Sequence, residues 1–452
     1  MILLRKILFP LAFLYWLITF IRNWLYDKGI FKSYDFDIPI IAVGNLSVGG
    51  TGKTPQIEYL IRLLSSNYQI AVLSRGYKRK TKGYALANES STALEIGDEP
   101  MQFHVKFPDV TVAVGEERLE AIPQLLHDRP KTEVIILDDG FQHRSIKAGL
   151  NILLTDYNNL FTRDFFLPTG DLRDERSSYK RAEIIIVTKC PALLNEEERQ
   201  EIIAEIKPLP HQQVFFATIA YGTPYHVLHP QQEYLLHKNL EILLVTGIAN
   251  IEPLKKHIVE HSYSYENLSF SDHHIFSIDD LKEIRKRFSK MDHPSKIIIT
   301  TEKDAVRLVK FKEELEDLPL FVLPIRHRIL FSKEEQLKKS VNRAQLENTE
   351  AFQIWGQEFA ELLLLRDENI ETKISISELQ YAATKHRAGL FAILLKAGFL
   401  SDFKNEFKKL DKTVLRILLM QLSFINSKEI DVEEFKKLAA LADANVVDLR
   451  SN

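Results

Sequence analysis

The stretch Ile40-Ile-Ala-Val-Gly-Asn-Leu-Ser-Val-Gly-Gly-Thr-Gly-Lys-Thr-Pro55 predicts the fold of this chain. An apolar, β-branched run enters a glycine-rich loop, and the amphipathic stretch 56–64 follows. A strand, a glycine-rich loop and a helix in this order form the context of a phosphate-binding loop (P-loop). We therefore expect one set of loop residues to bind the phosphates of a nucleotide: Ser47, Val48, Gly49, Gly50, Thr51, Gly52, Lys53 and Thr54.

The residue types of this loop suit that chemistry. Glycines let backbone N–H groups converge on phosphate oxygens, and the following helix adds the positive end of its dipole. Lys53 is expected to reach the β- and γ-phosphates, and the Thr54 hydroxyl to ligate Mg²⁺. Ser47 stands where the usual pattern begins with glycine, so its backbone must avoid strain. A glycine-rich turn that binds nothing is the alternative, and the adjoining Gly-Lys-Thr disfavours it.

A second acidic element supports the same interpretation. Residues 134–137 are apolar and lead into Asp138 and Asp139, followed by Gly-Phe-Gln-His. In P-loop folds an aspartate at a strand end faces the metal, directly or through water. A strand followed by an ordinary Asp-Gly turn is the alternative. Because Asp138 and Asp139 occur together with Lys53 and Thr54 of the P-loop, we favour the metal-binding interpretation over the turn.

Short apolar runs rich in β-branched residues alternate with longer amphipathic stretches along much of the chain. Runs this uniformly apolar fit strands buried on both faces, and hence a parallel sheet covered by helices. The predicted class is α/β, a P-loop NTPase-type parallel sheet with flanking helices. The runs are 39–43, 69–73, 111–114, 134–137, 151–155, 183–188, 241–246 and 296–300.

Composition and length limit the remaining choices. The 452 residues are 45% hydrophobic and 27% charged, which is a globular composition. A net charge of −3 argues against a nucleic-acid partner bound through bulk positive charge. The single cysteine, Cys190, excludes an intramolecular disulfide and a multi-cysteine metal site. We expect a membrane anchor at 1–30, a P-loop domain of one or two α/β lobes at 31–345, and a C-terminal all-α domain of unknown role at 346–452.

The N-terminal segment 7–21 contains no charged residue and is flanked by Arg5, Lys6 and Arg22. A bilayer-spanning helix needs about 20 apolar residues, so this segment is short. A cleaved signal peptide would need a small-residue cleavage site, which the sequence after the run does not supply. A helix buried in the hydrophobic core is the alternative without a membrane role. We expect a retained N-terminal membrane helix, shallow or barely spanning, whose basic flanks favour the cytoplasmic leaflet.

A P-loop indicates that a nucleotide is used, but not what accepts the phosphate. A membrane-tethered regulatory GTPase would need a lysine–aspartate motif for the base, which Thr-Glu-Lys-Asp at 301–304 faintly resembles. A small-molecule kinase would need a general base, for which Asp98 and His273 are candidates because a carboxylate–histidine pair can accept a hydroxyl proton. From spacing alone, a turn residue at Asp98 and a polar loop at His273 and His274 are slightly favoured.

Taken together, these elements resemble the tetraacyldisaccharide 4′-kinase (lipid A 4′-kinase) family over roughly residues 1–340. The resemblance also includes Ser-Arg-Gly-Tyr at 74–77 and Gly-Asp-Glu-Pro at 97–100. Its remaining motifs are Asp-Asp-Gly-Phe-Gln-His at 138–143, Leu-Pro-Thr-Gly-Asp-Leu-Arg at 167–173, Phe-Ser-Asp-His-His at 270–274 and Thr-Thr-Glu-Lys-Asp-Ala at 300–305. A serine at position 47 is also typical of that family.

The resemblance implies a kinase at the cytoplasmic side of the inner membrane. It would use ATP and Mg²⁺ to phosphorylate the 4′-hydroxyl of a tetraacyl glucosamine disaccharide 1-phosphate, the lipid A precursor. Its implied catalytic residues are Asp98 as the base, His273 as its partner, Asp138, Asp139 and Lys53, with Thr54 and Asp138 at the metal. Guanidinium groups suit phosphate, so Arg75, Arg118 and Arg173 become candidate substrate-binding residues.

Overall fold

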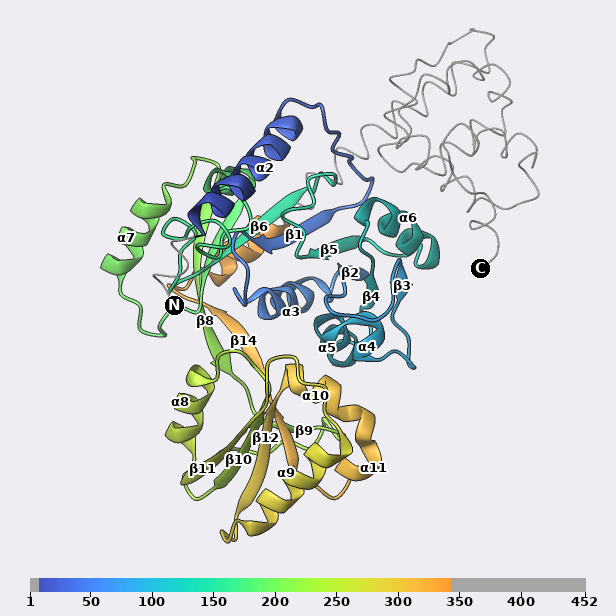
Figure 1. Ribbon diagram of the computed structural model, residues 1–452, viewed down its shortest axis with the longest axis vertical. Coiled ribbons are helices and arrows are strands. Elements are labelled where there is room, and N and C mark those ends of the chain that lie inside the picture. The colour runs from blue at the N-terminus through green and yellow to red at the C-terminus, as the bar shows by residue number, and fades with distance from the viewer. Residues whose placement is uncertain (1–7, 343–452) are drawn as a thin grey trace, which may run out of the picture.

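The computed structural model describes residues 8–342, which form two α/β lobes (Figure 1). The first lobe is built on a nine-stranded sheet of order β14-β8-β7-β6-β1-β5-β2-β4-β3. Its strands are β1 (Ile40–Asn45), β2 (Ile70–Ser74), β3 (Ala85–Leu86), β4 (Thr111–Val114), β5 (Val134–Asp138), β6 (Leu150–Asp156), β7 (Ile184–Thr188), β8 (Gln213–Tyr221) and β14 (Ile325–Ile329). All neighbours pair in parallel except the two edge strands, β3 and β14.

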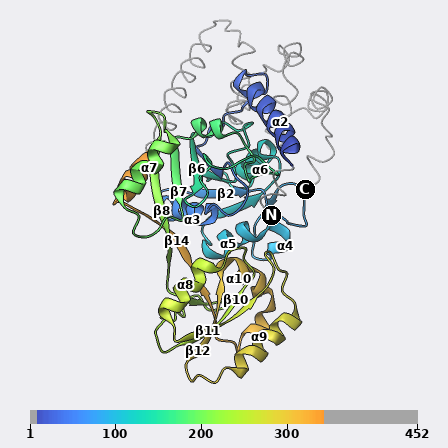
Figure 2. The ribbon, with the colours of Figure 1, turned by 60° about the vertical axis from the view of Figure 1, so that its left-hand side comes forward.

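The second lobe is built on a five-stranded sheet of order β11-β10-β12-β13-β9. Its strands are β9 (Tyr225–His226), β10 (Glu241–Thr246), β11 (Ser264–Ser269), β12 (Lys296–Thr301) and β13 (Leu320–Leu323). Only β9 pairs antiparallel. The chain enters this lobe along β8 and returns along β14, and the two strands lie side by side between the lobes (Figure 1, Figure 2).

Helices cover the sheets of both lobes. The first lobe carries α2 (Phe9–Asp27), α3 (Lys53–Leu64), α4 (Ala93–Ile96), α5 (Asp98–Lys106), α6 (Arg118–Asp128), η1 (Arg176–Arg181) and α7 (Glu196–Ile206). The second carries α8 (Glu252–His261), α9 (Ile278–Lys290), α10 (Glu302–Leu308), η2 (Val309–Phe311) and α11 (Lys312–Leu315). The predicted α/β class with parallel sheets is confirmed, and every predicted apolar run forms a strand.

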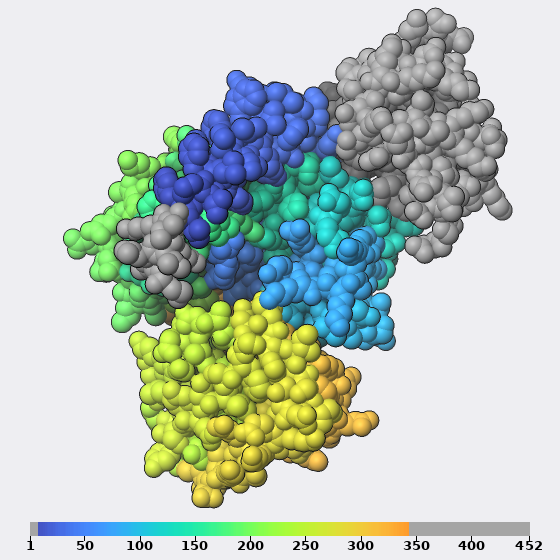
Figure 3. All heavy atoms as spheres, in the orientation of Figure 1, coloured from blue at the N-terminus to red at the C-terminus, as the bar shows by residue number. Residues whose placement is uncertain are grey.

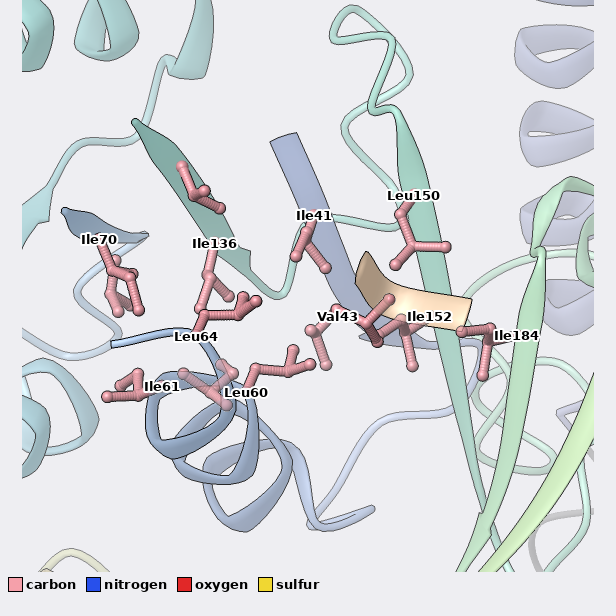
Figure 4. Close-up of a cluster of buried hydrophobic side chains, with 14 of the residues drawn as sticks. Ile41, Val43, Leu60, Ile61, Leu64, Ile70, Ile136, Leu150, Ile152 and Ile184 are labelled. Atoms are coloured by element: carbon pink, nitrogen blue, oxygen red, sulfur yellow. The ribbon is translucent and has the colours of Figure 1, made fainter. Parts of the chain in front are cut away.

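The core of the first lobe explains why these runs are apolar. Leu60 and Ile61 of α3 pack against Ile41, Val43 and Ile136 on one face of the sheet, and all five are buried (Figure 4). Alternate residues of β6, β7 and β8 fill a second cluster on the other face. Fully burying each such side chain contributes about 1.5–3 kcal/mol, so both helical layers hold the sheet.

The predicted N-terminal membrane helix is corrected by the structure. The apolar segment forms α2, but none of the helices at residues 8–342 is long and apolar enough to cross a membrane. Polar residues contribute to this, because Thr19 and Asn23 lie on the buried face of α2. The Asn23 amide donates to Asp174 at 2.8 Å and to Glu175 at 3.0 Å. The helix lies on the outside of the first lobe (Figure 3). The predicted all-α domain at 346–452 lies outside the described residues.

Candidate active site

The P-loop and the acidic pair meet at one edge of the first sheet. β1 ends at Asn45 and runs into the P-loop, and its neighbour β5 ends at Asp138. The next strand, β2, ends at Ser74. Because the carboxyl ends of parallel strands lie at the same edge, three separate motifs converge there.

The P-loop backbone has the conformations that its glycines permit. Gly49 and Gly52 have φ of 102° and 82°, a region that side chains disfavour. Gly52 is the N-cap of α3, so the helix begins at Lys53 and points its N-terminus at the loop. Ser47 keeps a negative φ and is buried, with its hydroxyl 3.3 Å from Asp164. Serine is therefore accommodated there without backbone strain.

Lys53 lies among polar partners at the sheet edge. Its ammonium donates to Asn45 Oδ1 at 3.1 Å and lies 3.4 Å from Asp139 Oδ1. Arg173 donates to both Asp139 oxygens and to Asn45 Oδ1. Burial alone would raise the pKa of Asp139, but Arg173 and Lys53 outweigh it and hold that pKa below its usual range. Asp139 is therefore a carboxylate matched by two cations.

Asp138 behaves differently, although it is the adjacent residue. It is 7% exposed and accepts a hydrogen bond from the Ser74 hydroxyl at 2.8 Å. Burial, followed by the charge of Asp139, raises its pKa to about 6. Two neighbouring carboxylates with opposite pKa shifts are typical of a functional site. An added cation would relieve the charge repulsion at Asp138.

A second cluster forms where the two lobes meet. Asp98 is the first residue of α5 in the first lobe, and His273 lies in the loop after β11 of the second. His273 Nδ1 lies 2.9 Å from Asp98 Oδ2, and since a carboxylate only accepts, Nδ1 carries the hydrogen. Arg307 of α10 donates to both oxygens of Asp98. Lys303 Nζ lies 3.2 Å from His273 Nε2.

The two adjacent histidines have different surroundings. His273 has a φ of 62° and faces Asp98, and its ring meets Tyr77 edge-on. His274 stacks on Phe270, and its Nε2 lies 2.9 Å from Asp280 of α9. His274 therefore packs within the second lobe, and His273 is the member of the pair that reaches the first.

The three candidate arginines do not share one environment. Arg75 is exposed, directly after β2. Arg173 lies at the P-loop with Asp139, as described above. Arg118 is 1% exposed and donates to the backbone carbonyls of Gly115 and Asp138. Burial lowers the pKa of Arg118 to about 10, against the raising effect of Asp138. Arg118 thus supports the acidic strand end from behind.

Two groups of residues at this site were missed by the sequence reasoning. Asn45 is fully buried and joins Lys53 to Arg173, and its only signal is its place between the strand and the loop. Arg307 was not expected beside Asp98, and Lys303 of the Thr-Glu-Lys-Asp motif was not assigned a contact with His273. Their proximity depends on the packing of two lobes, which no spacing in the sequence reports.

The fold and the site define a P-loop nucleotide-binding protein of the α/β class. A family model for tetraacyldisaccharide-1-P 4′-kinase (LpxK) matches residues 4–345. The chain belongs to this family.

Its relatives and one solved structure agree. The tetraacyldisaccharide 4′-kinase of Flavobacterium johnsoniae is 52% identical over 324 residues, covering 72% of this chain and 92% of the relative. The tetraacyldisaccharide 4′-kinase of Bacteroides thetaiotaomicron is 44% identical over 359 residues, covering 76% of this chain and 94% of the relative. The crystal structure of LpxK from Aquifex aeolicus in complex with ATP is 30% identical, has a TM-score of 0.60, and covers 75% of this chain and 99% of that one.

Proposed function

We propose that this protein transfers the γ-phosphate of ATP to the 4′-hydroxyl of a tetraacyl glucosamine disaccharide 1-phosphate, a step of lipid A synthesis. The family match and the named relatives support this reaction, and the solved relative with ATP supports ATP as the phosphate donor. The observation that carries the proposal is the Asp98–His273 pair, because it sets a candidate base on the P-loop lobe against a partner from the other lobe.

The P-loop lobe binds the nucleotide. The amides of residues 47–52 and the N-terminus of α3 hold the phosphates, and Lys53 exchanges its contact with Asp139 for the γ-phosphate. Thr54 and Asp138 would hold Mg²⁺, which would offset the negative charge that develops on the phosphate oxygens. This donor set fits, since Mg²⁺ typically takes one or two carboxylates and completes its shell with phosphates and water. The raised pKa of Asp138 is consistent with a carboxylate placed for a cation.

The base acts from the interface of the lobes. Asp98 orients the 4′-hydroxyl toward the γ-phosphate and accepts its proton as the new P–O bond forms and the bond to ADP breaks. His273, by donating to Asp98 Oδ2, keeps the carboxylate ionised and aimed. Asp139 stays ionised beside Arg173 and keeps that guanidinium in place for the transferring group, and it also holds Lys53 until the nucleotide binds.

The acceptor is a lipid, and the surface of the first lobe suits a membrane. Helix α2 exposes large apolar side chains beside its docked polar face, among them Phe9, Leu11, Phe13 and Ile18, each more than half exposed. We propose that the exposed apolar face of α2 contacts the cytoplasmic surface of the inner membrane, with its basic flank at the headgroups. Arg75 and Arg173 are proposed to bind the substrate 1-phosphate or ATP, and Arg118 to act through the strand end. No nucleic-acid partner is proposed.

The GTPase alternative is disfavoured by one buried side chain. A base-recognition aspartate must be open to the nucleotide, but Asp304 is fully buried and accepts from the Gly247 amide at 3.0 Å and the Thr301 hydroxyl at 2.7 Å. It shapes the start of α10 instead. The test is transfer of radiolabel from [γ-³²P]ATP or [γ-³²P]GTP to the purified lipid disaccharide in detergent micelles. Labelled lipid with ATP is expected, and nucleotide hydrolysis with GTP but no labelled lipid would overturn the proposal.

A further inference from the structure

Two helices from different lobes are tied together at both ends by ion pairs. Helix α5 of the first lobe and α10 of the second run antiparallel, since the start of each meets the end of the other. At one end, Asp98 binds Arg307. At the other end, Lys106 binds Glu302 and also Glu58 of α3, the latter at 2.6 Å. The two ends look alike as ion pairs, but only the first includes the proposed base.

The surroundings of Asp98 leave room for one more donor. Arg307 Nε donates to Oδ1 at 2.8 Å, Arg307 Nη2 donates to Oδ2, and His273 Nδ1 donates to Oδ2 at 2.9 Å. A carboxylate offers about four lone-pair positions, so about one stays open. A hydroxyl that binds there is restricted to a single direction, which in-line transfer requires.

Arg307 is itself held rigidly. Its side chain is 6% exposed, and its Nη1 lies 3.7 Å from Asp304, which is fully buried. The same nitrogen donates to the backbone carbonyl of His274 at 3.4 Å, in the loop that carries His273. One guanidinium therefore contacts both the carboxylate and the loop of its histidine partner.

We propose that Arg307 is a positioning residue for phosphoryl transfer: from the second lobe it aims the Asp98 carboxylate of the first, leaving one lone pair for the acceptor hydroxyl. This inference rests on the proposed function, in which Asp98 is the base. It follows that the base is complete only where α5 and α10 are packed together, so that acceptor chemistry depends on the contact between the lobes while nucleotide binding at the P-loop does not.

The charges around Asp98 give the inference a pH signature. Burial by itself raises the pKa of Asp98, but hydrogen bonds and charge from Arg307, and then from His273, bring it below its ordinary value. The other charged groups of this cluster pair with Lys303 or Arg307 of α10: Glu99 on α5, Asp272 in the His273 loop, and Asp304 on α10. Removing Arg307 therefore raises the pKa of Asp98, and the acid limb of the rate profile moves to higher pH.

The test uses the full-length enzyme with ATP and the lipid disaccharide in mixed micelles, from pH 4 to pH 9, so that an acid limb rising from below the ordinary carboxylate pKa enters the measured range. Arg307→Met is expected to lower kcat about 100-fold at pH 7 and to move the acid limb up by about one pH unit, with KM for ATP within twofold. Arg307→Lys keeps the charge but not the two-pronged geometry. Its kcat is expected to fall roughly tenfold with the acid limb unmoved, so it carries the test if Arg307→Met does not fold.

Glu302→Gln is the matched control at the other end of the same helix pair. It removes one charge from the lobe contact, keeps an oxygen for the Ile325 amide, and leaves Lys106 paired with Glu58. If Arg307 only joins the lobes, both positions should behave alike. We expect instead that Glu302→Gln lowers kcat less than threefold and leaves the pH profile unchanged.

A second control separates action through Asp98 from a separate structural effect. In an Asp98→Asn background, Arg307→Met should cause no further loss of kcat, because its effect passes through the same carboxylate. Multiplicative losses, or a wild-type kcat and acid limb in both Arg307 variants, would overturn the positioning role. Absence of lipid phosphorylation by the wild type, or full activity of Asp98→Asn, would instead contradict the proposed function. Failure of the positioning role and failure of the proposed function can therefore be told apart.

Discussion

The P-loop cluster and the interlobe cluster are built in opposite ways. Asn45 and Asp139 lie at the ends of two adjacent strands of one sheet, and Lys53 begins the helix that follows the first of them. Asp98 and His273, by contrast, come from different lobes and are 175 positions apart in the chain. The first cluster is set by strand order within a single core. The second exists only when two cores pack, so a change in lobe packing should alter acceptor chemistry before nucleotide binding.

The largest effect is expected from Lys53→Ala. Lys53 lies at the start of α3, outside the buried core, and its charge is proposed to act on the migrating phosphoryl group. Transfer should fall by about 10³-fold or more, with the melting temperature close to that of the wild type. The check is radiolabel transfer beside a thermal scan, with exposed Lys147→Ala as the control. Near-wild-type turnover would remove the P-loop cluster from the mechanism.

The next largest effect is expected from Asp98→Ala, which should lower kcat about 10²-fold. This is the low end of the range for loss of a general base, because phosphoryl transfer has a loose transition state. The dissociation constant for ATP should stay the same, since the P-loop is untouched. His273→Ala should be milder, and the double variant should lose less than the product of the two. Steady-state kinetics and ATP titration give these values. A large rise in the ATP dissociation constant would assign Asp98 to the nucleotide site.

A smaller effect is expected from charge on the exposed face of α2. Phe13→Asp and Ile18→Asp, at side chains 54% and 60% exposed, leave the Asn23 contacts intact. Each should lower binding to anionic vesicles about tenfold or more, because burial of such a side chain is worth about 1.5–3 kcal/mol. Vesicle co-sedimentation measures this. Val259→Asp, on an exposed apolar residue of the second lobe, is the control and should bind normally. Equal binding by all variants would show that α2 is not the contact surface.

The smallest effect concerns stability at His327, a residue behind the P-loop. His327 lies on β14, and its Nδ1 is 3.0 Å from Gln56 Oε1. Burial lowers the pKa of His327 to about 3, so the folded protein keeps this side chain neutral. With an unfolded pKa near 6.5, its stabilising contribution is complete above that value and is lost as pH falls toward 3. Between pH 8 and pH 6 the loss is about 1 kcal/mol.

Urea unfolding of His327→Asn at both pH values tests this linkage. The variant cannot be protonated at position 327, so its stability should fall less between pH 8 and pH 6 than that of the wild type, by about 1 kcal/mol. Burial also lowers the pKa values of His143 and His257, to about 4 each, so part of the pH dependence should remain. An identical pH dependence in the variant and the wild type would contradict the assignment.

Two of the missed strands, β11 and β14, differ from the predicted ones in their surroundings, whereas the missed strands β8 and β13 are largely buried inside their sheets. The runs at 39–43 and 134–137 form central strands with helices on both faces, and their composition records that burial. Both β11 and β14 are edge strands with polar residues, Ser264–Ser269 being half-buried throughout most of its length. An edge strand lacks one neighbour and is less enclosed, so its sequence carries no continuous apolar run to recognise.

The sequence alone determined the parallel α/β fold, the P-loop and the family, because each depends on residues that are neighbours along the chain or on adjacent buried strands. Tertiary structure decided what spacing cannot express. It set Asn23 of α2 against Asp174, turned Arg118 inward to backbone carbonyls, and brought Arg307 to Asp98. These contacts join segments whose separation in sequence bears no relation to their distance in space, and they form only when whole lobes and helices dock.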